Sequence, residues 1–452
     1  MKCPLLLLFL ALAVTLPVPP SPVHAAPVPE TQERLRLIIE TDAGGDPDDE
    51  QSLVRFLLYV NEWDVEGIVC NRLEVRDGEN RNPERTGLGV VRALVKAYGK
   101  CRANLILHDP RYPEEKHLWE RTVPGDGGTA RAVDLILAAV DSPDPRPLWY
   151  CDWGSDHGSG ENNLKRALDR VLRERGPEGY ARFKNRLRLS SHDAFGDHTR
   201  KISPPFRLWV DTYRPELNGR RWYHRFSDLT AKAGGFDLER DVRAGHGPLG
   251  ALYPVNTTSG QKEGDSMTFL HLVPTGMNDP AHPGRGSWAG RYGINEEEDG
   301  RSYYWANQSD TWNGSTGRDA TLARWAVQLQ NDFKARMDWC VTDFAGANHP
   351  PRPRLKGEAE RTVPPGSEII LDAGGSNDPD GGQSLNCRWT LYPEAGTYRG
   401  PPPELTDAHT PRARFTVPRT QAGQTLHFIL EATDTGSPPL TRCRRVIITV
   451  KE

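Results

Sequence analysis

The residues most able to do chemistry form an acidic run near the start of the chain. Residues 40–50 read Glu-Thr-Asp-Ala-Gly-Gly-Asp-Pro-Asp-Asp-Glu. Carboxylates at this density repel one another strongly unless a cation lies among them. Ca²⁺ suits such a group because it takes six to eight oxygen ligands, often carboxylates. Gly44 and Gly45 allow the tight backbone path that brings separated carboxylates around one ion. The run therefore predicts a calcium site.

Helix capping is a simpler interpretation of the same run. Asp48 and Asp49 stand at the expected start of a helix, where negative charge interacts favourably with the helix dipole. Capping accounts for one or two aspartates, but not for Asp42 and Asp46 as well. The sequence therefore favours a metal site over capping alone.

The elements that must position this run alternate between strand and helix. Apolar residues recur with helical spacing between the short β-rich segments, as at Leu53, Phe56, Leu57 and Val60. This alternation predicts an α/β fold with a mostly parallel, doubly wound sheet. Ligands of such sheets bind beyond the carboxyl ends of the strands, where the acidic run stands. The strands are expected at 35–41, 65–70, 103–107, 147–152, 187–191, 207–211 and 267–273.

The chain changes character after an expected closing helix at 319–339. Residues 346–354 are Pro-rich and predict a stiff linker. Beyond it, five short alternating runs predict an all-β immunoglobulin-like sandwich. We therefore expect an α/β domain at 35–345 and a sandwich at 355–452. The linker predicts that the first domain folds without the second.

The first 25 residues resemble a cleavable signal peptide. Lys2 precedes an apolar run at 5–14, and Val23-His24-Ala25 forms a small-residue cleavage site. The run is about ten residues long, whereas a spanning helix needs roughly 20. We therefore predict a secreted or periplasmic protein that has no membrane anchor after processing. Seven cysteines less Cys3 permit three disulfides there, with Cys387 and Cys443 as a candidate pair within one module, and buried free thiols are the alternative.

The composition excludes several classes of function. Lys and Arg number 57 and Asp and Glu 61, so the net charge is −4 and no basic surface for nucleic acid is expected. Hydrophobic residues make up 37% and charged residues 26%, which suits a chain with a packed core. The 43 glycines and 38 prolines follow no short period, which excludes a collagen-like fibre.

Several motifs together resemble the nucleoside hydrolases. Asp42, a glycine turn and Asp48-Asp49 are similar to that family's Asp-x-x-x-Asp-Asp signature, with two additional residues. The longer form resembles a sister family within the inosine/uridine-preferring nucleoside hydrolase superfamily: secreted, nucleoside hydrolase-like proteins described as cellulose-binding, with a C-terminal Ig-like module. The resemblance covers nearly all of the mature chain. Three further segments agree with it: Ile68-Val-Cys-Asn71, Trp153-Gly154 followed by Asn162-Asn163-Leu164, and Asn278-Asp279-Pro280.

The resemblance implies roles for individual residues. Asp42 would be the catalytic base and would also bind Ca²⁺ together with Asp49 and Asp279. The longer spacing leaves open whether Asp46 takes the place of one of the paired aspartates. Asn278 stands where the hydrolases have a histidine that serves the leaving group, which argues against an unchanged purine chemistry. The substrate-binding residues would be Asp46, Asp48, Asn71, Trp153 and Asn163.

Three residues outside these motifs are further candidates for substrate contact. His192 and Asp193 follow the expected strand at 187–191, so both could face the cleft. A packed or turn-capping role for His192 is the alternative. Trp288 lies in a glycine-rich aromatic loop, and tryptophan faces stack on sugars. A purely structural tryptophan is equally consistent with that loop.

Together these features predict an exported, Ca²⁺-dependent hydrolase of N- or O-glycosides. Cleavage of a glycosidic bond passes through an oxocarbenium-like state and needs a water on one face of the sugar. A cation and a neighbouring carboxylate would orient and deprotonate that water. The alternative is a non-catalytic protein that binds a cellulose-like glucan. The expected partner is thus a carbohydrate or nucleoside, without nucleic acid, and the family resemblance implies a homo-oligomer.

Overall fold

The structure is a computed structural model. It describes residues 33–45, 47–76, 84–125, 129–154, 163–191, 206–209, 229–255, 260–296 and 302–451. The expected signal peptide and the candidate residues Asp46, His192 and Asp193 lie outside these ranges. None of the helices within these ranges has the length and apolar character needed to cross a bilayer.

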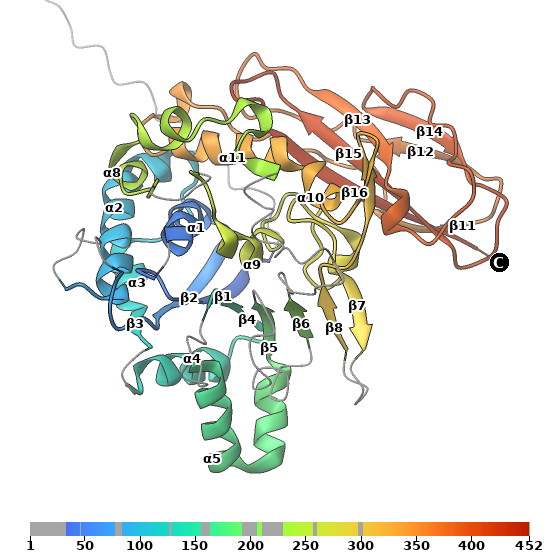
Figure 1. Ribbon diagram of the computed structural model, residues 1–452. Helices are drawn as coiled ribbons and strands as arrows, with labels where there is room; N and C mark the ends of the chain where they lie inside the picture. The colour runs from blue at the N-terminus through green and yellow to red at the C-terminus, as the bar shows by residue number, and fades with distance from the viewer. Residues whose placement is uncertain are drawn as a thin grey trace, which may run out of the picture.

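An eight-stranded sheet organises the first part of the chain (Figure 1). Its strand order is β3-β2-β1-β4-β5-β6-β8-β7, and all neighbours are parallel except the pair β7 and β8. The chain moves outward from β1 in one direction through β2 and in the other through β4, which makes the carboxyl end of β1 a switch point for ligands. The strands are β1 (Leu35–Thr41), β2 (Trp63–Cys70), β3 (Thr122–Pro124), β4 (Leu148–Asp152), β5 (Leu187–Ser191), β6 (Phe206–Trp209), β7 (Gly293–Glu296) and β8 (Ser302–Trp305).

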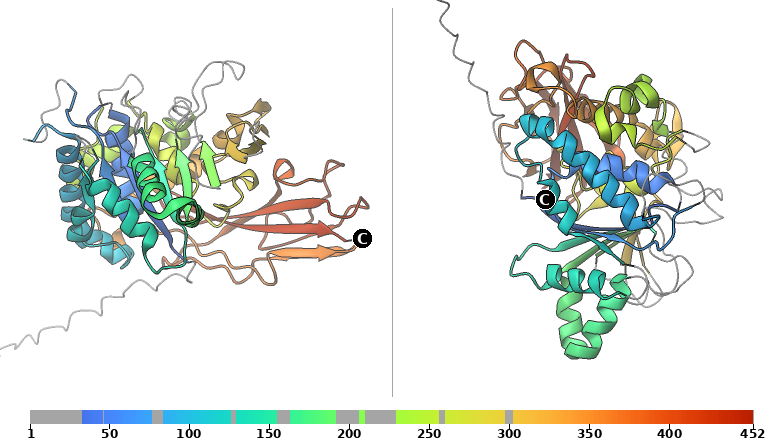
Figure 2. Two further views of the ribbon diagram at one scale, coloured as in Figure 1. Left: turned by 90° about the horizontal axis from the view of Figure 1, so that it is seen from below. Right: turned by 90° about the vertical axis from the view of Figure 1, so that its left-hand side faces the viewer.

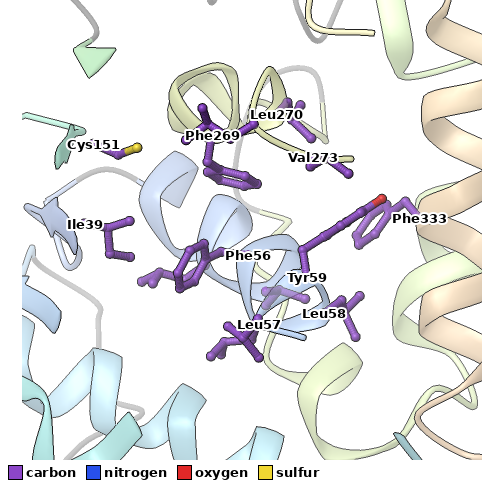
Figure 3. Close-up of a cluster of buried hydrophobic side chains, with 14 of the residues drawn as sticks. Ile39, Phe56, Leu57, Leu58, Tyr59, Cys151, Phe269, Leu270, Val273 and Phe333 are labelled. Carbon is purple, nitrogen blue, oxygen red and sulfur yellow. The ribbon is translucent and has the colours of Figure 1, made fainter. Parts of the chain in front are cut away.

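Helices cover both faces of this sheet, which confirms the doubly wound α/β prediction. Ile39 of β1 packs in one buried cluster with Phe56 of α1, shown in Figure 3. Its neighbour Ile38 packs on the other face with Ile136 of α4. Successive residues of β1 thus point into two separate cores. The helices are α1 (Pro47–Tyr59), α2 (Gly87–His108), α3 (Glu115–Glu120), α4 (Arg131–Asp141), α5 (Asn163–Asn185), α8 (Gly247–Ala251), α9 (Met267–Leu270), α10 (Ala320–Ala323) and α11 (Ala326–Asp338).

Three expected elements of this part are wrong. Residues 103–107 belong to α2 and not to a strand, because the buried positions Tyr98, Cys101 and Leu105 continue one face of that helix. Residues 267–273 form α9 and the turns after it, and the expected helix at 319–339 is divided into α10 and α11. Apolar runs this short fit either a strand or a buried helical turn, so periodicity alone does not distinguish them.

The second part of the chain is the predicted all-β sandwich. A four-stranded sheet with the order β11-β16-β15-β13 packs over the pair of β12 and β14. Trp389, Phe415 and Phe428 lie in the core between them. The strands are β11 (Glu360–Val363), β12 (Glu368–Asp372), β13 (Asn386–Leu391), β14 (Arg412–Thr416), β15 (Thr425–Thr433) and β16 (Thr441–Val450), and a separate hairpin consists of β9 (Asp310–Trp312) and β10 (Ser315–Gly317).

The two parts share a core, although the sandwich extends well away from the α/β sheet in Figure 2. Tyr392 and Cys443 of the sandwich belong to the same buried cluster as the side chains of α1 and α11. Arg442 of β16 pairs with Asp332 of α11 at 2.7 Å. The backbone N–H of Cys443 donates to the carbonyl of Thr275 at 2.9 Å. These contacts oppose the expectation that the α/β part folds without the sandwich.

All six cysteines of the described chain are free and buried. Cys387 and Cys443 lie on strands that flank β15 on opposite sides, facing Ala432 and Glu431 in the register. The structure therefore has the buried thiols that the sequence left as the alternative, and the candidate pair Cys387 and Cys443 forms no disulfide.

Candidate active site

Five aspartates gather at the carboxyl ends of β1 and β4. Asp42 directly follows β1, and Asp152 is the last residue of β4. Asp48 and Asp49 open α1, which starts at the same edge of the sheet, and Asp265 lies in the 3₁₀ turn before α9. Each of these five residues is at most 6% exposed. The structure thus places a buried acidic group where an α/β sheet holds its ligand.

The turn after β1 has a backbone path that requires glycine. Gly44 has φ +95°, and a Cβ at this position would lie 2.7 Å from a methyl group of Val75. The Gly44 N–H donates to Glu50 Oε1 at 3.1 Å. Glu50 in turn accepts two hydrogen bonds from Arg76, at 2.6 and 2.9 Å. Glu50 therefore fixes the turn. Asp42 before the turn and Asp48 and Asp49 after it are thereby held together at the end of β1.

Asp48, Asp49 and Asp265 each offer an oxygen within 4.8 Å of the others. Burial raises the pKa of Asp49 well above its usual value, and the charges of Asp265, Asp42 and Asp48 add to this. Burial and the charges of Asp48 and Asp42 raise the pKa of Asp265 in the same way. Ionised together, these groups need a cation among them. Carboxylate oxygens at this spacing fit a hard divalent ion such as Ca²⁺.

Two basic side chains neutralise part of this charge. Lys262 Nζ lies 3.1 Å from Asp48 Oδ2, and an Arg72 nitrogen lies 3.7 Å from Asp42 Oδ2. Lys262 and Arg72 therefore offset part of the negative charge of Asp48 and Asp42.

Asp279, expected as the third calcium ligand, lies apart from this group. Its carboxylate accepts from His282 Nδ1 and from Arg285, each at 2.9 Å. The preceding Met277 carbonyl accepts from Arg445 of β16, so this segment is bound to the sandwich. The adjacent Asn278 lines a cavity at the amino ends of β1 and β2, the opposite edge of the sheet. Asp265 stands among the aspartates in its place.

A second buried network surrounds Glu40, the penultimate residue of β1. Glu40 is fully buried and accepts from Asn163 Nδ2 at 2.6 Å, from Asn71 Nδ2 at 3.2 Å and from the Tyr150 hydroxyl. Burial and the charge of Asp152 raise the pKa of Glu40 to about 7, against these hydrogen bonds. Glu40 therefore joins the ends of β1, β2 and β4 to the start of α5.

The expected substrate-binding residues differ in their access to a ligand. Asn163 is 2% exposed, and its amide also contacts the Gly125 carbonyl and Arg166, so it serves the framework. Asn71 remains partly exposed beside the acidic group. Trp153 is 2% exposed and packs against Phe56 and Phe269.

Trp288 is equally buried and lies apart from the aspartates. Its exposed fraction is 2%, and the guanidinium of Arg442 lies over its ring at 5.6 Å. The loop of Trp288 therefore packs against β16 of the sandwich. This burial favours the structural alternative for this tryptophan over a role in stacking on a sugar.

Sequence reasoning missed Asp265, Lys262, Asp152 and the role of Glu40. Glu40 and Asp152 are charged residues inside otherwise apolar strand ends, a signal that could have found them. Asp265 lies far from the acidic run in sequence, and its only local signal is the segment Glu-Gly-Asp-Ser before an apolar stretch. The helix α9 brings it to the site by packing over β4 and β5, where the Thr268 carbonyl accepts from Ser190 Oγ at 2.7 Å.

Comparison with known proteins agrees with this architecture. Residues 36–292 match the family model of the nucleoside hydrolase-like domain of cellulose-binding Sde182. Residues 368–450 match the model of the C-terminal domain of cellulose-binding protein Sde0182. A search of curated proteins found no significant match.

One solved structure is similar over nearly the whole chain. It is a nucleoside hydrolase-related hypothetical protein from Saccharophagus degradans that is described as associated with carbohydrate metabolism. The two chains are 30% identical, with a TM-score of 0.73 over 93% of this chain and 100% of the other. Two other solved structures align less well. A PKD domain from KIAA 1837 protein has 25% identity over 22% of this chain and 85% of the other, with a TM-score of 0.17. The effector protein XOO4466 has 8% identity over 69% of this chain and 95% of the other, with a TM-score of 0.35, and both scores are too low to indicate a shared fold. With its α/β domain, its sandwich and its acidic group at the end of β1, the chain belongs to the Sde182 nucleoside hydrolase-like family.

Proposed function

We propose that the acidic site is that of a Ca²⁺-dependent hydrolase acting on N- or O-glycosides. The observation that carries the proposal is the group of Asp48, Asp49 and Asp265, whose oxygens lie within 4.8 Å of one another beside Asp42. Capping of α1 explains Asp48 and Asp49 but gives no reason for a third buried aspartate from another part of the chain. In this proposal Asp265 takes the ligand position that the sequence assigned to Asp279.

The chain's own residues would perform the following steps. Asp42 faces the same site but is not one of the three aspartates whose oxygens lie within 4.8 Å of one another. It would therefore be the group that accepts a proton from an attacking water. The water oxygen bonds to the anomeric carbon as the glycosidic bond breaks, and the leaving group takes a proton from solvent. Ca²⁺ would supply orientation of the water and of vicinal sugar hydroxyls. One displacement without a covalent intermediate predicts inversion at the anomeric centre.

Binding of a glucan without turnover is the second candidate function. The observation that favours it is the description of both matching family models as cellulose-binding. Under this proposal the acidic group would stabilise the fold through its ion, and the polysaccharide would lie on another surface. The two proposals share the metal but differ in the need for Asp42.

Calcium analysis and a substrate panel distinguish the two proposals. The full chain would be analysed for bound metal and then assayed for sugar release from nucleosides and aryl glycosides. We expect bound calcium, with turnover that is lost in Asp42→Asn and retained in the control Asp279→Asn. Calcium without turnover on any member, together with retention on insoluble glucan, would support the binding protein. Absence of bound calcium and no effect of added calcium on thermal unfolding would overturn the metal site.

A further inference from the structure

A chain of three hydrogen bonds crosses the boundary between the α/β part and the sandwich. Asp380 Oδ1 lies 2.7 Å from His349 Nδ1, and His349 Nε2 lies 2.8 Å from His108 Nδ1. His108 Nε2 lies 3.1 Å from the carbonyl oxygen of Thr342. His108 is the last residue of α2, His349 lies in the Pro-rich segment, and Asp380 belongs to a turn of the sandwich. Both imidazoles are buried, with exposed fractions of 5% and 4%.

The two ends of this chain determine how many protons it holds. The Asp380 carboxylate and the Thr342 carbonyl only accept hydrogen bonds. Each of the three bonds therefore needs a proton on a ring nitrogen, or on Asp380 itself. Two neutral imidazoles carry one ring proton each, so together they supply two. The observed geometry requires one proton more than two neutral histidines and an ionised aspartate contain.

We propose that the native protein binds one additional proton in this chain, which makes the contact between its two parts dependent on pH. The proton belongs to His349, whose ring then donates to Asp380 on one side and to His108 on the other. Burial lowers the pKa of His108 to about 4, so that ring is the neutral member. This inference is independent of the proposed function.

The surroundings of His349 suit a cationic ring. Phe344 stacks on it with ring centroids 3.8 Å apart and an interplanar angle of 14°, and Trp339 stacks on it at 5.3 Å and 25°. Aromatic faces attract a cation placed over them. The backbone N–H of His349 also donates to Asp380 Oδ2 at 2.7 Å.

Further charged groups face the hydrogen-bonded histidines from every element packed against them. Asp378 and Asp434 of the sandwich interact with Asp380, and Asp343 after α11 interacts with His108. A cavity of about 310 Å³ borders both histidines. The other charged residues lining it are Glu33, Arg34, Glu62, Asp109, Arg111, Arg336, Arg352, Arg354, Arg442 and Arg444.

Loss of the additional proton would break one of the three bonds. A neutral His349 that still donates to His108 would turn a lone pair toward the Asp380 carboxylate, and the two would repel. Unfolded histidine is neutral above about pH 6.5, so under this proposal folding there requires the uptake of one proton. Because the state that binds more protons is weakened by their removal, stability falls as the pH rises through this range.

The substitution Asp380→Asn tests this proton count. The amide oxygen can accept the His349 backbone N–H while the amide N–H donates to His349 Nδ1, so two neutral rings then satisfy all three bonds. For the wild type we expect the unfolding equilibrium constant in urea to increase by up to tenfold per pH unit above about pH 6.5. Asp380→Asn should remove that dependence.

The matched control is Asp338→Asn, which alters another histidine–aspartate pair. His246 Nε2 lies 3.0 Å from Asp338, and a single neutral ring satisfies that bond, so the wild-type dependence should persist. Nitrogen-15 NMR of the wild-type imidazoles supplies a test that needs no variant. We expect both His349 nitrogens protonated and His108 protonated at Nε2 only. Two neutral rings near pH 7, or equal pH dependence in wild type and Asp380→Asn, would overturn the proposal.

Discussion

Crowding of buried carboxylates is the main feature of the site at the scale of single residues. Asp49 and Asp265 are held beside each other and beside Asp48 and Asp42, and the pKa of each is raised by burial and by the neighbouring charges. Without a cation this arrangement opposes folding, and with one it becomes a binding site. The energetic cost of the site and its affinity for metal therefore have the same origin.

Replacing Asp265 tests that common origin. In the presence of a chelator, we expect Asp265→Asn to unfold at a higher urea concentration than wild type, because one buried charge is removed. Calcium at about a hundred times its Kd should stabilise the wild type by about 2.7 kcal/mol and the variant far less. Asp279→Asn is the control and should respond as the wild type does. A full calcium response in Asp265→Asn would show that the ion binds elsewhere.

A buried histidine gives a second residue-scale prediction, on stability in acid. Burial lowers the pKa of His271 to about 3, and the ring packs edge-on to Trp149. Between about pH 6.5 and 3 the unfolded chain takes up a proton at this residue and the native state does not. Stability should therefore fall with falling pH, by up to about 1.4 kcal/mol per unit from this residue.

The variant His271→Phe keeps an aromatic ring and removes the titration. Urea unfolding at a series of pH values should show a shallower decline in acid than in wild type. The exposed His409 offers a comparison, because His409→Gln should leave the wild-type decline unchanged. An unaltered decline in His271→Phe would mean that this ring is protonated in the native state.

At the scale of elements, the connection from β1 to α1 determines where the aspartates point. Gly44 adopts φ +95°, and its missing side chain makes room for Val75. An alanine there combines an unfavourable backbone conformation with a steric conflict.

We expect Gly44→Ala to cost about 2 kcal/mol or more of unfolding free energy and to weaken calcium binding. Gly314→Ala is a useful comparison, because Gly314 has φ +76° and a Cβ added there would meet no atom within 4 Å. Its cost should be confined to backbone strain of about 1–2 kcal/mol. Calorimetry with and without calcium measures both effects, and equal costs for the two variants would contradict the steric argument.

The elements were predictable where the local pattern was long or continuous. The apolar runs of β1, β2, β4 and β5, and the acidic run before α1, have clear signals within the sequence. The last turns of α2 and all of α9 do not, since a short apolar run fits a strand equally well. Asp265 reaches the site only because α9 packs over β4 and β5, so its role depends on tertiary structure that no local pattern contains.

At the scale of the whole molecule, the sandwich is part of the support of the α/β domain. Asp332 in α11 is 2% exposed and forms salt bridges with Arg336 of its own helix and with Arg442 of β16. The charges of these arginines and the Tyr59 hydroxyl hold the pKa of Asp332 at about 2, against the effect of burial. Removal of one partner leaves a buried charge less well compensated.

We expect Arg442→Met to lower the free energy of unfolding by about 3 kcal/mol and to leave a single unfolding transition. The shared core predicts that both parts unfold together in calorimetry. Arg412→Met is the control, because Arg412 pairs with Asp372 on the exposed side of the sandwich and should cost less than about 1 kcal/mol. Two separate transitions in the wild type would show that the parts are independent.

Gly276, in the α/β part of the chain, packs directly against β16 of the sandwich. A Cβ at Gly276 would lie 2.0 Å from the Cys443 carbonyl, and the neighbouring Thr275 accepts a hydrogen bond from Cys443. Domains usually fold as units while the ribosome is still making the chain. Here β16, which covers this part of the α/β core, comes after all the α/β elements in the sequence. The α/β core is therefore incomplete until β16 has been made, and cuts that remove β16 should destabilise the α/β part as well as the sandwich.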